Sequence, residues 1–348
     1  MASHAPSAES VTFTNEIGMT ASPEPAKKSI SRDLLQGIDL TGQEGNHSLV
    51  DQGFTWLVQG MALSVVIVLG WMSWVIFGQA RPAIEKFGFG FLSTQNWDVN
   101  ELIFGALPYI YGTLVSSAIA LLIALPIGLA VAVVTSESFL PPWIRSPIAF
   151  IVELIAAIPS VIVGLWGIFV LIPFLQPIQQ WLFQHFSWIP IFNSDPAGPS
   201  MLVAGVILAI MILPTIAAIS RDVLIAIPKE LRSASASLGA TPWETTFRVL
   251  LPSAISGILG AAMLGLGRAL GETMAVTMVI GNSDQISTSL LDPGNTIPAL
   301  LANQFAEASD GLHIGALMYL ALVLFALTLI VNMIATVMVK FLRADGQS

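Results

Sequence analysis

The sequence predicts an all-α polytopic membrane protein with six transmembrane helices. Of its 348 residues, 55% are hydrophobic and only 10% are charged. Soluble domains carry about 25% charged residues, so the composition excludes an ordinary soluble protein. Apolar stretches of about 20 residues, the length that crosses the hydrocarbon core of a bilayer, recur along the chain. Because the sequence contains no cysteine and only four scattered histidines, we expect no disulfide, thiolate nucleophile or metal site.

The first 50 residues are predicted to be a flexible cytoplasmic tail. They are rich in Ser, Glu, Pro, Gly and Thr and carry no sustained apolar period. Within them, SISRDLLQGI (residues 29–38) favours a short interfacial helix. The segment has no charged start followed by a short apolar core and a small-residue cleavage site, so a cleaved signal peptide is not expected.

Residues 51–343 form the predicted transmembrane domain. Pro126, Pro159 and Pro214 lie within the second, third and fourth spans and predict kinks, which are tolerated where neighbouring helices or water satisfy the freed carbonyls. The aromatic segment 176–199 favours an aromatic belt or a short helix at the membrane interface. The six spans are predicted at 56–77, 107–134, 147–172, 201–219, 253–280 and 314–339.

The distribution of basic residues predicts the orientation of the chain. An even number of spans places both termini on one side of the membrane. If that side is the cytoplasm, ten lysines and arginines face the cytoplasm, Arg81 and Lys86 face outward, and Arg268 lies in the membrane. The positive-inside rule therefore predicts that both termini are cytoplasmic.

The segment between the fourth and fifth spans, residues 221–252, predicts a helix–turn–helix outside the membrane. Pro228 can end one helix and begin another, and Gly239 stands where a helix would stop. Thr241 is a suitable N-cap and Pro242 fits a first helical turn, so a second helix is expected there. On physical grounds alone, the element could be a simple amphipathic connector.

The spacing of this segment resembles the coupling loop of ABC importer permeases. That pattern is Glu-Ala-Ala, three residues, Gly, nine residues, Ile, one residue and Leu-Pro. Here Gly, Leu and Pro match, Val249 stands in for Ile, and Ser233 replaces the usual Glu. The resemblance implies that this element docks into a groove on a separate cytoplasmic ATPase. The residues that it assigns to this coupling are Ser233, Ala234, Ser235, Gly239, Ala240, Leu251 and Pro252.

The ATP hydrolysis that would power such a permease is expected to take place in another chain. The sequence contains no G-x-x-x-x-G-K-[ST] phosphate loop, so ATP would be hydrolysed by a partner chain and no cofactor is expected here. An intramembrane enzyme is the alternative from a different class. It would need paired carboxylates, a Ser/His pair or metal ligands, and the spans do not offer them.

The fifth span contains two charged residues, within GLGRALGETMAV. A charge at the bilayer centre costs about 2.5–3.5 kcal/mol, so such residues are functional candidates. On a continuous helix, Arg268 and Glu272 share one face, one turn apart. The structural alternative is a mutual ion pair that neutralises both charges. Gly265, Gly267 and Gly271 would let another helix approach closely, as at a seam between subunits.

The longer stretch GLGRALGETMAVTMVIGN resembles the fifth-span signature of the PstC-type permease subunits of phosphate ABC importers. PYIYGTLVSSAIALLIALPIGLAVAV (108–133) and VELIAAIPSVIVGLWGIFVLIP (152–173) are similar as well, so the resemblance covers roughly residues 55–340. It implies a type I ABC importer permease fold with a cytoplasmic coupling helix, in the bacterial inner membrane. It also implies a pathway for inorganic phosphate, of which this chain forms half.

The resemblance implies partners too. They are a second permease subunit of the PstA type, an ATPase dimer of the PstB type, and a phosphate-binding protein of the PstS type, periplasmic or lipid-anchored. A PhoU-type regulator is a further candidate, and no nucleic acid is expected. Two functional alternatives stay open: a permease for sulfate or molybdate, and a role in phosphate signalling alongside transport.

Four residues are the candidates for the substrate pathway. Arg268 presents a planar fork of donors to an oxyanion and stays charged when desolvated. Glu272 either holds Arg268 at rest or accepts the hydroxyl hydrogen that phosphate carries and sulfate lacks. Glu153, in the third span, either gates the inner half of the pathway or pairs with a basic residue at the interface. Thr273 is a candidate oxyanion donor, although hydroxyls on membrane helices more often bond to their own backbone.

Overall fold

A computed structural model describes residues 47–137 and 139–345 of the chain. Most of the predicted tail, including the helix proposed at 29–38, lies outside the described residues. The first helix of the described residues begins at His47, so the last four residues assigned to the tail are helical. The chain divides into two compact units, residues 1–67 and 68–348. The described part of the first unit belongs to a single helix.

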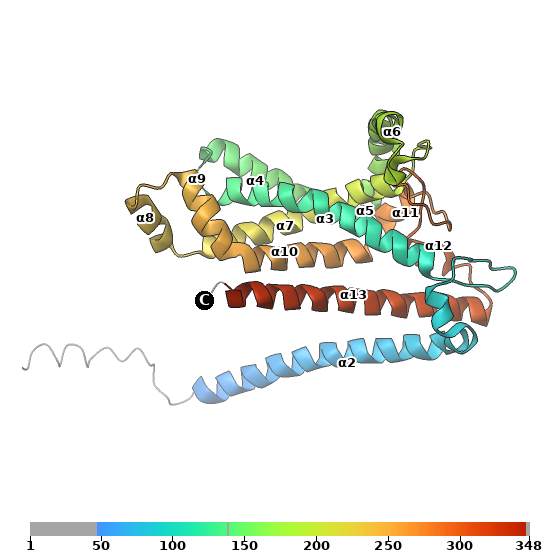
Figure 1. The fold of residues 1–348 in the computed structure, drawn as a ribbon. Helices are drawn as coiled ribbons and strands as arrows, with labels where there is room; N and C mark the ends of the chain where they lie inside the picture. Colours follow the sequence, from blue (N-terminus) through green and yellow to red (C-terminus); the bar gives the residue numbers. More distant parts are fainter. Residues whose placement is uncertain (1–46, 138, 346–348) are drawn as a thin grey trace, which may run out of the picture. The chain divides into compact units, whose positions relative to one another are not determined.

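Within the described residues the chain is helical apart from its connecting loops, and six helical segments are long and apolar enough to cross a membrane (Figure 1). The predicted number of spans is therefore confirmed. The α-helices are α2 (His47–Phe87), α3 (Leu107–Ser136), α4 (Pro142–Ala157), α5 (Ser160–Trp166), α6 (Ile172–Phe186), α7 (Met201–Ala226), α8 (Lys229–Ser237), α9 (Pro242–Thr245), α10 (Leu251–Gly271), α11 (Met274–Val279), α12 (Ile297–Gln304) and α13 (Gly311–Asp345). Shorter turns of 3₁₀ or π type are η1 (Gly88–Leu92), η2 (Gly167–Leu171), η3 (Pro190–Phe192) and η4 (Thr246–Leu250).

Helix α7 is the central helix of the second unit. In its most apolar window 61% of the residues are buried, against 33% or less in the other five candidate spans. It packs against α3 and α10 (Figure 1). Glycines permit this close approach, since a Cβ added to Gly265 of α10 would lie 2.9 Å from Cγ1 of Ile216 on α7. Small residues at helix contacts are the usual way in which membrane helices approach closely.

The third span differs from its predicted form. A kinked helix was expected over residues 147–172, but α4 ends at Ala157 and α5 begins at Ser160. Ile158 and Pro159 between them have extended backbone, with ψ of 126° and 138°. Proline disfavours the helical conformation in the residue before it, which explains why the helix stops here. The candidate span shifts to Ser160–Phe186, and it includes the first part of the predicted interfacial aromatic segment.

The two ends of the second unit carry different structures. Helices α8 and α9 lie at one end, and α6, α11 and α12 lie at the other (Figure 1). The end with α12 is held by an aromatic and amide cluster, in which Trp97 Nε1 donates to Gln304 Oε1 over 2.9 Å. The ring of Phe91 stacks on Tyr319 with centroids 4.4 Å apart. The sequence marks as functional the end of α10, where Arg268 lies, Glu153 of α4 and the α8–α9 element.

Candidate functional site

The charged centre of the fifth span lies at an interruption of the helix. Helix α10 ends at Gly271, and α11 begins at Met274. Glu272 has φ −68° and ψ 125°, so its backbone is extended. Glu272 is the C-cap of α10 and only its ψ departs from helical values, so the sharing of one helical face by Arg268 and Glu272 stays a prediction. Glycine has a low helix propensity, by about 1 kcal/mol relative to alanine, and Gly271 weakens the last turn of α10.

Arg268 and Glu272 do not form an ion pair in this structure. Among the described residues, their charged groups are not within the 4.0 Å that defines such a pair. Arg268 instead donates from Nη1 to Oγ1 of Thr215 on α7, over 3.4 Å. This distance is long for a hydrogen bond, and the Arg268 residue is exposed in the chain. Because a guanidinium has five N–H donors, most of those on Arg268 are available to a ligand.

The neighbours of Arg268 on α10 divide into a packed and an uncovered side. Gly265 contacts α7, as described above. A Cβ added to Gly267 or Gly271 would meet no atom of the described residues within 4 Å. The side of α10 that carries Gly267, Arg268 and Gly271 is thus not covered by the described part of this chain. Thr273 donates from Oγ1 to the carbonyl of Gly271 over 3.2 Å, which is the backbone-bonded alternative considered for it.

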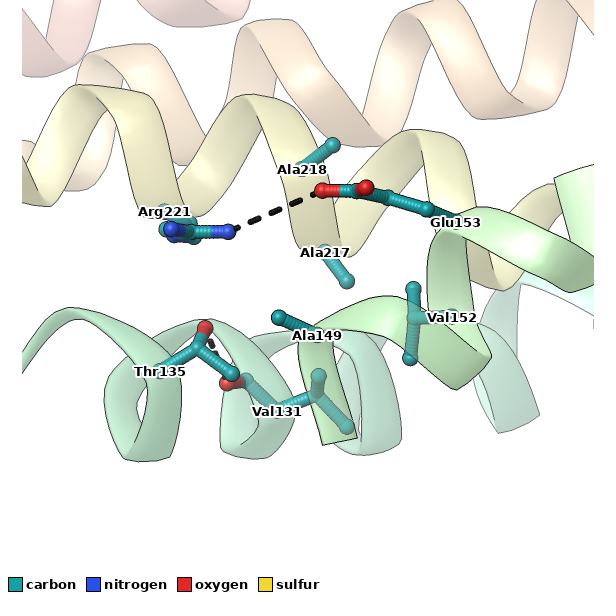
Figure 2. Close-up of a pocket in the computed structure, with 8 residues that line it drawn as sticks. All are labelled: Val131, Thr135, Ala149, Val152, Glu153, Ala217, Ala218 and Arg221. Atoms are coloured by element: carbon teal, nitrogen blue, oxygen red, sulfur yellow. Dashed lines mark hydrogen bonds and ion pairs between the residues drawn. The ribbon is translucent and has the colours of Figure 1, made fainter. Parts of the chain in front are cut away.

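Glu153 lies in α4 and faces Arg221 of α7 (Figure 2). Their Oε1 and Nη1 atoms are 3.9 Å apart, at the outer limit of an ion pair. The two residues line a small cavity of about 20 Å³, together with Val131 and Thr135 of α3. Of the two alternatives for Glu153, pairing with a basic residue is present in the structure, and the gating role stays a prediction.

The sequence did not identify Arg221 as the partner of Glu153. The fourth span was predicted to end at residue 219, which placed Arg221 in the loop that follows. Helix α7 continues to Ala226, so Arg221 lies in its last two turns. The two charged residues are 68 positions apart, and no spacing rule connects them.

The α8–α9 element has the predicted helix–turn–helix form. Gly239 follows α8 with φ +82°, a conformation that glycine adopts without strain. Its N–H donates to the carbonyl of Ala236 over 3.0 Å, and the N–H of Ala240 donates to the carbonyl of Ser235 over 3.2 Å. This pair of bonds is the Schellman motif, which satisfies the last carbonyls of a helix. The predicted stop of the first helix at Gly239 is confirmed.

The second helix of the element begins with a capping box. Oγ1 of Thr241 accepts from the N–H of Glu244 over 3.3 Å, and the Glu244 carboxylate accepts from the N–H of Thr241 over 2.9 Å. Pro242 occupies the first turn, as predicted. The π turn η4 then leads into α10, where Leu251 and Pro252 form the first residues. The capped start of α9 is therefore confirmed, and the element connects directly to the span that carries Arg268.

The predicted coupling residues have two different surroundings. Ser233, Ala234 and Gly239 are exposed, so they are available to a partner. Ser235 is buried, and its hydroxyl lies 2.9 Å from the hydroxyl of Thr245 on α9. Ser235 thus joins the two helices of the element to each other. Ala240 is half-buried in the turn between them.

Arg232 of α8 binds the end of α3, a contact that the sequence did not predict. Its Nη2 donates to Oε1 of Glu137 over 2.8 Å. The same guanidinium donates to the carbonyls of Leu224 and Ile227 at the end of α7, over 2.9 Å each. The side chains of Arg232 and Glu137 are 25% and 14% exposed. One side chain therefore connects the ends of α3, α7 and α8.

Comparison with known proteins places this fold and site in a family. Residues 124–344 match the family described as "Binding-protein-dependent transport system inner membrane component". The chain is 44% identical to the phosphate transport system permease protein PstC of Mesorhizobium japonicum, over 86% of this chain and 93% of that protein. It is 38% identical to a probable phosphate transport system permease protein PstC of Methanocaldococcus jannaschii, over 79% of this chain and 88% of that protein.

A solved structure has a similar fold. It is a bacterial alginate ABC transporter in complex with an alginate pentasaccharide-bound periplasmic protein; one chain of it aligns with a TM-score of 0.54 and 16% identity, over 82% of this chain and 94% of that chain. Together with the six apolar helices, these matches define a type I ABC importer permease, a multi-pass protein of the inner membrane. The chain belongs to the family of binding-protein-dependent transport system inner membrane components and, within it, to the PstC-type permeases.

Proposed function

We propose that this chain is a permease subunit of an ATP-driven phosphate importer and forms half of its translocation pathway, opposite a second permease subunit of the PstA type. The single observation that carries the proposal is the exposed guanidinium of Arg268. It lies beside a helix break in an apolar span and has one long hydrogen bond to Thr215. The phosphate-transport names of relatives at 38–44% identity support the choice of substrate.

Arg268 binds the phosphate oxyanion in this proposal. Charge-assisted bonds from a guanidinium to phosphate oxygens are stronger than the single neutral bond to Thr215, so substrate displaces that bond. Glu272 is not paired with Arg268, which favours the second of its two roles. Its carboxylate accepts the hydroxyl hydrogen of hydrogen phosphate, a donor that sulfate lacks. Thr273 and Glu153 stay secondary candidates along the same pathway.

The α8–α9 element faces the cytoplasm and docks on a PstB-type ATPase dimer. Its exposed small residues, Ser233 and Ala234, suit close contact with a groove. The sequence has no phosphate loop, so ATP is used by the partner ATPase and no cofactor is bound by this chain. This arrangement requires both termini to be cytoplasmic, in agreement with the excess of basic residues on that side. A PstS-type protein delivers phosphate from the outer side, and a PhoU-type regulator is a further partner.

The test is phosphate uptake in cells that lack their own high-affinity system. The chain is supplied with its partner permease, ATPase and binding protein, as wild type and as Arg268→Ala. Arg81→Ala is the matched control, because Arg81 is an exposed arginine that pairs only with Glu85 on its own helix among the described residues. We expect uptake with wild type and Arg81→Ala, and at least a hundredfold loss with Arg268→Ala at equal membrane levels.

The same cells distinguish the competing substrates. Unlabelled sulfate and molybdate are added as competitors at concentrations that saturate their own importers. Uptake of sulfate or molybdate instead of phosphate would overturn the proposed substrate. Normal phosphate uptake by Arg268→Ala would leave the transporter intact and remove Arg268 from the pathway.

A further inference from the structure

Two residues that follow α3 contact the α8–α9 element: Glu137, the C-cap of α3, and Phe139, in the connection from α3 to α4. Arg232 of α8 binds Glu137, as described above. Trp243 of α9 stacks on Phe139, with ring centroids 4.5 Å apart and planes 25° from parallel. We call these two contacts the α3 clamp. Its members are Glu137 and Phe139 on the α3 side and Arg232 and Trp243 on the element.

The clamp adds a connection that the chain path does not supply. Through its backbone, the α8–α9 element continues only into α7 on one side and α10 on the other. Helix α3 is 95 residues away from Arg232 along the sequence at the point of contact. Without side-chain contacts, a displacement of the element would act directly on α7 and α10 alone. The clamp gives α3 its own attachment.

Arg232 is suited to such a mechanical role because its guanidinium makes four hydrogen bonds, to Glu137, Leu224 and Ile227. One edge of the guanidinium binds the carboxylate of Glu137, and Nη1 and Nη2 also reach carbonyls at the end of α7. Because the guanidinium is planar and is held by bonds in several directions, it moves together with the groups that it binds. Cavities of about 400 Å³ and 260 Å³ lie beside the pair, and both are lined by Glu137 and Arg232. Beside these cavities, Ala132 and Val133 of α3 pack in an apolar cluster with Leu224 of α7. The polar contact adds a directional attachment to that packing.

We infer that Arg232 and Glu137 are positioning residues for coupling: they make α3 move with the ATPase-docking element during each transport cycle. The inference rests on the proposed function, since it requires an ATPase that displaces α8 and α9. Helix α3 packs along α7, the helix that carries Thr215 and Arg221. A movement of α3 would therefore reach the helix that lies beside the proposed substrate pathway. Neither residue is assigned contact with the substrate.

The first test is the ratio of phosphate transported to ATP hydrolysed, measured with the complete complex in proteoliposomes. Glu137→Gln removes the charge and keeps an acceptor for Arg232, and Glu137→Asp restores the charge on a shorter side chain. Glu85→Gln is the control, since it removes the partner of Arg81 from an exposed ion pair elsewhere. We expect Glu137→Gln to lower the ratio about tenfold, with ATPase binding and hydrolysis within twofold of wild type. Glu137→Asp should recover part of the ratio.

The second test follows α3 directly with spin-label distances. This chain has no cysteine, so it can be labelled at single introduced cysteines before it is assembled with its partners. Leu122 on α3, Leu264 on α10 and Phe325 on α13 are all exposed. We measure the α3–α13 and α10–α13 distances with and without trapped nucleotide. In Glu137→Gln, the nucleotide-dependent change of the α3–α13 distance should fall below half of its wild-type value, while the α10–α13 change persists.

The outcomes separate the two proposals. An unchanged transport ratio and an unchanged α3 movement in Glu137→Gln would overturn the clamp while wild-type transport upholds the proposed function. Equal loss of both distance changes would also overturn it, because that result indicates general uncoupling. Failure of the wild-type complex to transport phosphate would instead count against the proposed function.

Discussion

Arg232 and Arg268 lie on helices of the same compact unit, but their guanidinium groups have very different surroundings. Arg232 binds a carboxylate at 2.8 Å and two carbonyls at 2.9 Å, and its side chain is 25% exposed. Arg268 is exposed and has one bond of 3.4 Å to a threonine hydroxyl. The comparison teaches that an arginine with engaged donors holds structure, whereas one with open donors is available to a ligand. The following predictions test that distinction.

The largest expected effect is on the stability of the chain when Arg232 is removed. Arg232→Ala leaves Glu137 largely buried without its partner, and breaking a buried pair in this way costs about 3 kcal/mol. For a domain of this size, the unfolding midpoint should fall by roughly 5 °C. Arg268→Ala should leave the midpoint within about 1 °C, since it removes one weak bond. Both midpoints are measured by heating the purified protein and monitoring the folded fraction by size-exclusion chromatography. Equal shifts for the two variants would refute the distinction between engaged and open arginine donors.

A second prediction compares the two sides of α10 near Arg268. Gly265→Ala places a Cβ 2.9 Å from Cγ1 of Ile216, so overpacking should cost about 1 kcal/mol after the gain in helix propensity. Gly267→Ala meets no described atom within 4 Å and should not destabilise the chain. The same thermal assay applies. A greater loss for Gly267→Ala would show that the Arg268 side of α10 is packed rather than open.

The third prediction concerns the turn between α8 and α9. Gly239 has φ +82° and open space around its Cα, so Gly239→Ala adds backbone strain without a clash. We expect a loss of about 1 kcal/mol and a midpoint lower by about 2 °C. Gly239→Asn should lose less, because asparagine tolerates this conformation better. Identical behaviour of the two variants would mean that the strain is relieved by movement of the turn.

The smallest effect is expected at Thr215. Thr215→Val removes the one bond to Arg268 and keeps the side-chain volume. A net hydrogen bond is worth about 0.5–1 kcal/mol, so the KM for phosphate should change about two- to fivefold with little change in kcat. Thr215→Ser keeps the hydroxyl and should behave as wild type. A large fall in kcat would indicate that Thr215 contacts the substrate itself.

The sequence predicts some of these features well because their signals are local. Hydropathy finds the six spans, and Gly239, Thr241 and Pro242 define the turn and the two helices of the α8–α9 element. The break at Pro159 was taken for a kink, because membrane helices often continue through proline. The break at Glu272 has no proline, and α11 beyond it packs against α5, a contact that only the folded chain contains.

The ion pairs were missed for a related reason. Glu137 with Arg232 and Glu153 with Arg221 join residues 95 and 68 positions apart. Periodicity relates residues within one helix, so it gives no information about such pairs. The ion pair of Arg268 with Glu272, which was the structural alternative to a pathway role, relied on the helical spacing of four and is not among the ion pairs of the described residues. Arg268 was placed correctly in its span, whereas Arg221 was placed in a loop and Glu153 in a span that begins only at Ser160, so the partners required the tertiary structure.

The uncovered face around Arg268 also bears on how the protein is made in the cell. A newly inserted chain carries this cation in an apolar span, at a cost of about 2.5–3.5 kcal/mol until another surface or water shields it. Gly267 and Gly271 beside it leave room for a neighbouring helix. An orphan chain is therefore a target for membrane quality control. Balanced synthesis with its neighbouring permease should set how much of it accumulates.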